Sequence, residues 1–145
     1  MPKKIIGRID KVDFPTLDLF DIDIKIDTGA FTSSMHCHQV VEEDNLLKCL
    51  FFDKEHPNYN KKIIVFKNYS TTKVKSSNGM VQKRYIVKTS VILFEKKYKI
   101  DLTLSTRSEM KYPILIGRKF LSKKFLVDIN LKNLSYLKKR DLQIK

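Results

Sequence analysis

One stretch decides how the chain is interpreted, residues 24–30, which read Ile-Lys-Ile-Asp-Thr-Gly-Ala. Isoleucine alternates with a polar residue up to Asp27, and this period of two is typical of a strand with one buried face. The strand then ends in a carboxylate at a polar turn that contains a glycine. The pattern therefore predicts a rigid loop that presents Asp27 at the end of a strand.

An Asp-Thr-Gly loop has the parts that acid-catalysed amide hydrolysis needs. A water held between two carboxylates that share one proton is activated by one of them, while the other acts as the acid. Two like charges a few ångströms apart cannot both ionise, so such a pair titrates as a unit. The tripeptide is also the sequence of an ordinary polar turn, so its context has to decide between the two interpretations.

Strand-like patterns recur along almost the whole chain. Predicted strands cover residues 22–26, 46–52, 62–66, 85–94, 98–104, 114–116 and 125–131, with a hairpin loop at 95–97. The one helix candidate is 118–124, directly after Gly117, and the charged end at 138–145 is expected to fray. Asn78-Gly79 predicts a two-residue hairpin turn, because both residue types tolerate positive φ. We expect residues 1–145 to form a single all-β domain.

The composition is that of a globular chain. Hydrophobic residues make up 42% and charged residues 31%, which excludes a disordered polymer. No apolar run approaches the roughly 18 residues that a membrane helix needs. The start of the chain has no apolar core of a secretory signal, so the cytoplasm is the expected location and no membrane partner is expected. Cys37 and Cys49 are accordingly expected to be reduced.

The net charge is +13, from 29 Lys+Arg against 16 Asp+Glu. Such a surface attracts polyanions such as nucleic acid or acidic polypeptide. Lysines are spread along the chain without an arginine-rich tract or a nucleic-acid recognition motif, so nucleic acid is not the expected partner.

Several further segments accompany Asp27 in a fixed order. They lie at residues 6–8, 27–30, 32–36, 76–79, 84–85, 115–118 and 125–128. This order resembles that of retroviral-type aspartic peptidases, with a catalytic loop, a flap hairpin and a buried strand that enters a short helix through Gly-Arg. More closely, the chain resembles the retropepsin-like bacterial family known as ATP-dependent zinc proteases, and the resemblance covers nearly the whole chain.

The resemblance implies a closed acid-protease barrel of the retropepsin-like kind, with one short helix near the C-terminal third. It implies a catalytic Asp27, a catalytic loop of Thr28, Gly29 and Ala30, and a flap tip of Ser76, Ser77, Asn78 and Gly79. Arg84 either holds the base of the flap or lines a solvated face. Arg118 either pairs with a carboxylate at a dimer interface or has no such role.

The chain contains one Asp-Thr-Gly, whereas the chemistry needs two carboxylates. Asp128 lacks the glycine of such a turn and is better explained as a polar strand position. A two-fold homodimer would therefore supply the second Asp27, and two-fold dimers are the commonest oligomers.

The ATP and zinc of the family's name have little support in the residues. No phosphate-binding glycine loop is present, and no cofactor is expected. His36, Cys37 and His38, with Cys49 and His56, offer zinc ligands without an established zinc motif. On a regular strand His36 and His38 would share one face, so a zinc-binding protein remains an alternative.

The favoured function is an aspartic endopeptidase that works as a homodimer. The resemblance adds a link to ATP-grasp glutamate ligases, which extend proteins with acidic tails. Because a body of charge +13 attracts polyglutamate, an acidic, glutamate-rich polypeptide is the expected substrate. The other alternative is a non-catalytic binding module on a peptidase fold that recognises acidic protein or RNA.

Overall fold

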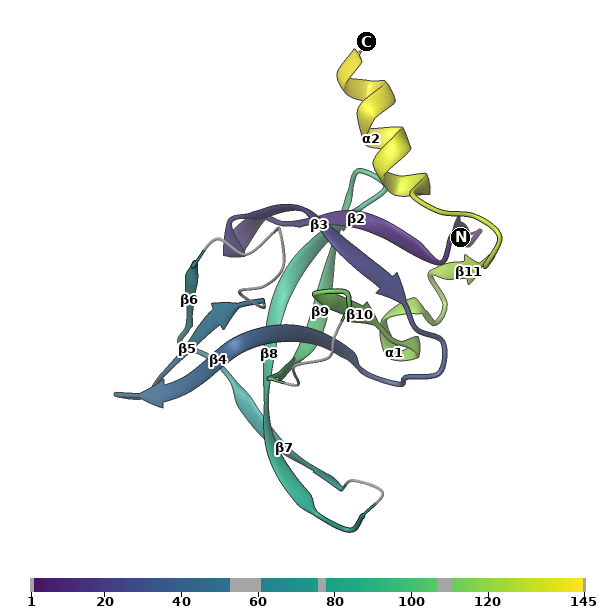
Figure 1. The fold of residues 1–145 in the computed structure, drawn as a ribbon. Coiled ribbons are helices and arrows are strands. Elements are labelled where there is room, and N and C mark those ends of the chain that lie inside the picture. Colours follow the sequence, from purple (N-terminus) through teal and green to yellow (C-terminus); the bar gives the residue numbers. More distant parts are fainter. Residues whose placement is uncertain (1, 53–60, 76–77, 107–110, 145) are drawn as a thin grey trace.

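Strands dominate the computed structural model, which describes residues 2–52, 61–75, 78–106 and 111–144 (Figure 1). The strands are β1 (Lys4–Ile6), β2 (Ile9–Phe14), β3 (Leu19–Ile26), β4 (Ser33–Glu43), β5 (Leu46–Phe51), β6 (Ile63–Phe66), β7 (Ser70–Lys75), β8 (Val81–Leu93), β9 (Lys96–Ser105), β10 (Ile114–Ile116) and β11 (Phe125–Val127). The helices are a 3-10 turn at Pro15–Leu17, α1 (Arg118–Leu121) and α2 (Leu134–Ile144).

Six strands close into a barrel, as the resemblance implied. The hydrogen-bonded order is β10-β3-β2-β8-β9-β4, and β4 pairs back with β10 through Met35 and Ile114. β5 and β6 extend this sheet beyond β4, and β7 pairs with β8 alone. β1 and β11 form a separate parallel pair. Closure removes the exposed sheet edges of the ring itself.

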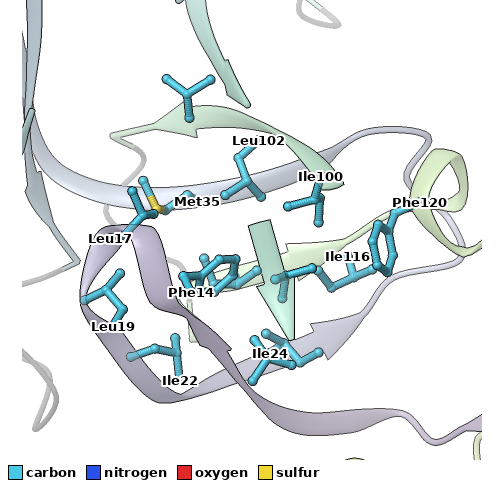
Figure 2. Close-up of a cluster of buried hydrophobic side chains, with 14 of the residues drawn as sticks. Phe14, Leu17, Leu19, Ile22, Ile24, Met35, Ile100, Leu102, Ile116 and Phe120 are labelled. Atoms are coloured by element: carbon cyan, nitrogen blue, oxygen red, sulfur yellow. The ribbon is translucent and has the colours of Figure 1, made fainter. Parts of the chain in front are cut away.

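The barrel interior is filled by the apolar residues that alternate along the strands. Figure 2 shows Phe14, Ile24, Met35, Leu102 and Ile116 gathered in one cluster, and each of them is fully buried. Burying a side chain of this size contributes about 1.5–3 kcal/mol. This interior fixes the register of β3, because a slip of one residue would turn its isoleucines to solvent.

The parallel pair β3–β10 brings two distant segments of the chain to one place. Ile24, Lys25 and Ile26 lie opposite Ile114, Leu115 and Ile116. Since parallel strands end at the same edge of a sheet, residues 27–30 and the Gly117-Arg118 step leave this edge side by side. The fold therefore positions the predicted catalytic loop against the start of α1.

The C-terminal region differs from the sequence prediction. The short helix predicted at 118–124 is present as α1 (Arg118–Leu121). A second helix, α2, runs from Leu134 to Ile144, although residues 138–145 were expected to fray. Its N-terminus is capped by Asp10, a residue that is 1% exposed and whose carboxylate accepts the N–H groups of Ser135 (3.0 Å) and Tyr136 (3.1 Å). The cap comes from 125 residues away, so no local pattern announces the helix.

Burial is the main influence on the pKa of Asp10 and raises it above the ordinary value, although the hydrogen bonds from the N–H groups of Ser135, Lys11 and Tyr136 lower it.

A second contact ties α2 to the barrel, because Lys139 forms ion pairs with Asp13 (2.9 Å) and Asp21 (2.7 Å). These contacts hold α2 at one end of the barrel, from which it projects in Figure 1.

Three smaller predictions also differ from the structure. Cys37 and Cys49 form a disulfide with a Cα–Cα distance of 6.1 Å, because the pairing of β4 with β5 brings them together. The predicted strand 125–131 stops at Val127. The hairpin predicted at 95–97 turns instead at Phe94 and Glu95, which both have positive φ. Among the described residues, no helix is long and apolar enough to cross a bilayer.

We predict that Asp10→Ala lowers the free energy of unfolding by about 2 kcal/mol and reduces the helical signal in far-UV circular dichroism. The variant leaves the N–H groups of Lys11, Ser135 and Tyr136 without their shared acceptor, and a lost cap or buried acceptor typically costs about 1–3 kcal/mol. Asp141→Ala, at an exposed carboxylate of the same helix, is the control. Equal losses in the two variants would contradict the capping role of Asp10.

Candidate active site

Asp27 directly follows β3 and is held by backbone groups on both sides. Its N–H donates to the carbonyl of Ile116 (2.8 Å), which continues the β3–β10 pairing by one residue. The N–H of Gly29 donates to its Oδ1 (3.1 Å), and the N–H of Ala30 donates to its carbonyl (3.2 Å). Asp27 is half-buried while Thr28 and Gly29 are exposed. The carboxylate is therefore oriented at the surface of the barrel, where a substrate can reach it.

The loop after Asp27 is held by the start of α1. The guanidinium of Arg118 donates to the carbonyl of Thr28 (2.9 Å), and its backbone N–H donates to the carbonyl of Ala30 (2.9 Å). The N–H of Lys119 donates to the carbonyl of Phe31 (2.9 Å). Neither of the two roles considered for Arg118 from the sequence included this contact, because a side-chain bond to a distant backbone carbonyl leaves no sequence signal.

Gly117 makes this contact possible. A Cβ at this position would lie 2.6 Å from the carbonyl oxygen of Thr32 and 2.7 Å from that of Phe31, closer than side chains approach backbone atoms. The N–H of Gly117 also donates to the buried Oγ of Ser33 (3.0 Å). Only glycine allows the two backbone segments to pack this closely, which gives a physical reason for the Gly-Arg of the sequence pattern.

A hollow of about 600 Å³ lies beside the loop and is lined in part by Thr28, Phe31, Arg118 and Val127. Phe31 is 59% exposed, and the guanidinium of Arg118 lies 5.9 Å from its ring centroid, a cation–π geometry. Phe31 therefore presents an exposed apolar ring close to the loop of Asp27.

The predicted flap coincides with a long hairpin of β7 and β8 that extends away from the barrel (Figure 1). Asn78 accepts the N–H of Met80 (3.2 Å), and Gly79 has φ +84°. The strands stop at Lys75 and resume at Val81, so the loop is longer than the two-residue turn predicted from Asn-Gly. Ser76 and Ser77 lie outside the described residues. The role of the hairpin as a flap stays a prediction.

The base of this hairpin is held to β4 by residues that the sequence reasoning missed. Glu42 accepts hydrogen bonds from the hydroxyls of Tyr69 and Tyr85 (3.4 Å for Tyr85), and the two rings meet edge to face at 5.8 Å. The hydrogen bond with Glu42 raises the pKa of Tyr69 to about 12. Arg84, considered for this role, instead lies opposite Thr72 in the hairpin. The pairing of three distant residues could not be read from the sequence.

The residues considered for zinc are separated by a β-bulge. The register of β4 against β5 shifts between Cys37 and Gln39, so His36 is 1% exposed and packs against Phe52, while His38 is exposed. The two histidines therefore do not share a face, and the disulfide of Cys37 removes its thiolate as a ligand. His56 lies outside the described residues, among which no group of three or more His, Cys, Asp or Glu is placed to hold a metal ion.

Asp128 is not positioned as a second catalytic carboxylate. It follows the end of β11 instead of lying within a strand as predicted, and its Oδ1 accepts the N–H of Asn130 (2.9 Å). Its side chain therefore stabilises a turn. Asp27, by contrast, has a carboxylate that the N–H of its own loop orients.

Comparison with known proteins identifies one family and a group of longer relatives. The sequence model of the RimB-like family, described as the retropepsin-like aspartic endopeptidase RimB, matches residues 5–138. A Shewanella halifaxensis protein named "Probable alpha-L-glutamate ligase" is 33% identical over 130 residues, which cover 87% of this chain and 28% of that protein. A protein of the same name from Parasynechococcus marenigrum is 30% identical over 131 residues, with the same coverage. The chain thus spans about 28% of the length of these relatives.

Among solved structures, the Legionella pneumophila protein Lpg0085, whose function is unknown, has the same fold. The TM-score is 0.71 at 25% sequence identity, and the similarity covers 92% of this chain and 99% of that protein.

We predict that Glu42→Gln lowers the pKa of Tyr69 from about 12 toward its ordinary value of 10.0, because the anionic acceptor is removed while the side-chain shape is kept. NMR titration of the tyrosine rings, with Tyr69→Phe used for assignment, measures the change. A raised pKa means that the contact contributes stability below pH 10.0 and loses it as the pH rises through about 12. Glu43→Gln is the neighbouring control, and an unchanged Tyr69 pKa in Glu42→Gln would show that Glu42 does not hold this tyrosine.

Proposed function

This chain belongs to the RimB-like family of retropepsin-like aspartic endopeptidases, and we propose that it hydrolyses peptide bonds as a homodimer with one Asp27 from each subunit. The observation that carries the proposal is the position of Asp27. Its carboxylate is oriented by the Gly29 N–H on a loop that Arg118 and Gly117 brace from the other side. A carboxylate prepared in this way suits a reaction in which small displacements of the acid and base are costly.

In the proposed reaction the two Asp27 carboxyl groups share one proton. The ionised carboxylate removes a proton from a water held between them, and the water oxygen forms a bond to the carbonyl carbon of the substrate. The protonated carboxyl donates a hydrogen bond and then its proton as charge develops on the substrate. The carboxyl group that took the proton from water then donates it to the amide nitrogen, and the carbon–nitrogen bond breaks as a hydroxyl of the tetrahedral intermediate returns a proton to the other carboxylate. One water is consumed for each peptide bond, and the pair again holds one proton.

Exposed apolar side chains near the loop support the dimer. Phe31, which directly follows the catalytic loop, is 59% exposed. Ile5 and Leu126, at 51% and 54% exposure, lie side by side in the β1–β11 pair. Lys3, which precedes β1, and Val127, the last residue of β11, line the same hollow as Thr28 and Phe31. The exposed apolar side chains of Phe31, Ile5 and Leu126 favour burial against a second copy of the chain.

The β7–β8 hairpin would serve as the flap. A hairpin that closes over bound substrate excludes bulk water and strengthens the electrostatic interactions of the carboxyl pair. Glu42 would act as the fixed support of this hairpin, because it holds Tyr69 and Tyr85 where the hairpin leaves the barrel. The tip residues Asn78 and Gly79 would then lie closest to the substrate.

The proposed substrate is a polypeptide with an acidic, glutamate-rich tail. The net charge of +13 favours such a partner. The name of the longer relatives, alpha-L-glutamate ligase, supports a functional link to an ATP-grasp ligase that would add the glutamates. We take residues 1–145 as one retropepsin-like domain and the cytoplasm as its location. In that compartment the Cys37–Cys49 pair would be exposed to reducing conditions.

We predict that Asp27→Asn lowers kcat/KM on a quenched fluorescent peptide with a glutamate tail by about 10³-fold or more, because it removes the acid–base pair. The thermal midpoint should change little, since Asn keeps the shape of the loop. Asp141→Asn, at an exposed carboxylate on α2, is the matched control and should retain full activity. Undiminished cleavage by a folded Asp27→Asn protein would end the proposal.

A further inference from the structure

A second concave site, whose lining does not include Asp27, lies on the outer side of the barrel. It is a groove of about 580 Å³ between the β8–β9 hairpin and the segment that contains α1. Its charged lining consists of four lysines, Lys88, Lys99, Lys119 and Lys124, and one aspartate, Asp101. Neither the zinc alternative nor the carboxyl-pair chemistry uses these residues.

The positive charge in the groove is only partly neutralised. Asp101 forms one ion pair, with Lys119 (3.2 Å), and both side chains are solvent-accessible. In the β8–β9 pairing Lys88 lies opposite Asp101 and Lys99 lies opposite Ser90, so Lys88 and Lys99 are diagonal neighbours. Two cations at such positions repel each other. An anionic ligand between them would relieve this repulsion.

Lys124 is held at the edge of the groove. Its Nζ donates to the carbonyl of Phe120 (2.9 Å) and lies 4.8 Å from the centroid of the Phe120 ring. These contacts restrict the ammonium group to one region, which lowers the entropy lost when it binds an anion. Hydroxyl side chains, among them Ser90 and Thr103, complete a lining that can donate hydrogen bonds to carboxylates or to a peptide backbone.

The lining favours an acidic peptide over a nucleic acid. Among the described residues that line the groove, Phe120 is the one aromatic side chain, and it is 5% exposed. A base would therefore find no exposed ring on which to stack, and stacking supplies much of the affinity for single-stranded nucleic acid.

The groove is also connected to the region of the catalytic loop. Thr32 and Ser33, which follow the loop, line the groove, and Lys119 lines both the groove and the hollow beside Thr28 and Phe31. A polypeptide bound at Asp27 could therefore continue past α1 into the groove.

We propose that this lysine groove binds an acidic segment of a polypeptide through its carboxylates, as an exosite separate from Asp27. Its role in substrate selection rests on the proposed peptidase function, whereas its binding of an acidic peptide does not. The exosite would set which proteins are brought to the carboxyl pair, and the residues at the pair would set the bond that is cleaved.

Binding is tested in the Asp27→Asn background, so that no probe is consumed. The probe is fluorescein-labelled hexaglutamate, and its Kd is measured by fluorescence anisotropy. Lys88→Gln with Lys99→Gln should raise the Kd about tenfold, as expected for two lost charge contacts. The control, Lys67→Gln with Lys132→Gln, removes the same charge from exposed lysines outside the groove and should raise the Kd less than about twofold. Equal weakening by the two double variants would overturn the exosite, because net charge alone would then explain binding.

A uridine hexamer is the competing ligand. Hexaglutamate should bind more tightly than this RNA, and stronger, groove-dependent binding of the RNA would overturn the assignment to an acidic peptide. With Asp27 present, Lys88→Gln with Lys99→Gln should raise KM for a glutamate-tailed peptide and leave kcat unchanged. If neither the wild-type protein nor any variant cleaves the peptide, but hexaglutamate binding still depends on Lys88 and Lys99, the peptidase proposal fails and the binding site stands.

Discussion

The structure around Asp27 depends on one close approach between two backbone segments. The parallel pairing of Ile26 with Ile116 brings the end of β3 and the end of β10 to the same point. From there the loop of Asp27 and the Gly117-Arg118 step run in contact, with carbonyl groups of the loop bonded to N–H groups of α1. The absence of a Cβ at Gly117 allows the approach, and the buried apolar cluster behind it (Figure 2) fixes the register of both strands. The position of the carboxylate is therefore a property of the barrel as a whole.

Local patterns in the sequence predict much of this fold. Alternating isoleucines predict β3, the β-branched run predicts β8, and the apolar triplet before Gly117 predicts β10, because burial on one or both faces leaves a periodic trace. The misses share a physical cause. The α2 helix is capped by Asp10, the disulfide depends on the register of β4 against β5, and His36 and His38 are separated by a bulge. Each depends on residues that meet only after folding.

The residues of the candidate site fall into the same two groups, those that a sequence pattern indicates and those that meet only after folding. Asp27, Gly29 and the Gly117-Arg118 step could be identified from motifs, because a carboxylate on a tight turn and a glycine at a close approach constrain the residue type itself. The bond from Arg118 to the Thr28 carbonyl and the Glu42 contacts with Tyr69 could not. The described chain offers one oriented carboxylate at this loop, whereas the proposed chemistry needs two carboxyl groups, one as the acid and one as the base. The proposed chemistry therefore requires a symmetric dimer, in which the second subunit supplies the second carboxyl group.

The most direct measurement of this requirement uses mixed dimers. Wild-type and Asp27→Asn chains are unfolded together, refolded at varied ratios at constant total concentration, and assayed on one glutamate-tailed peptide. If each active site needs an Asp27 from both subunits, activity falls with the square of the wild-type fraction, because dimers with one variant chain are inactive. A linear dependence would show that one Asp27 per site is sufficient, and it would contradict the shared carboxyl pair.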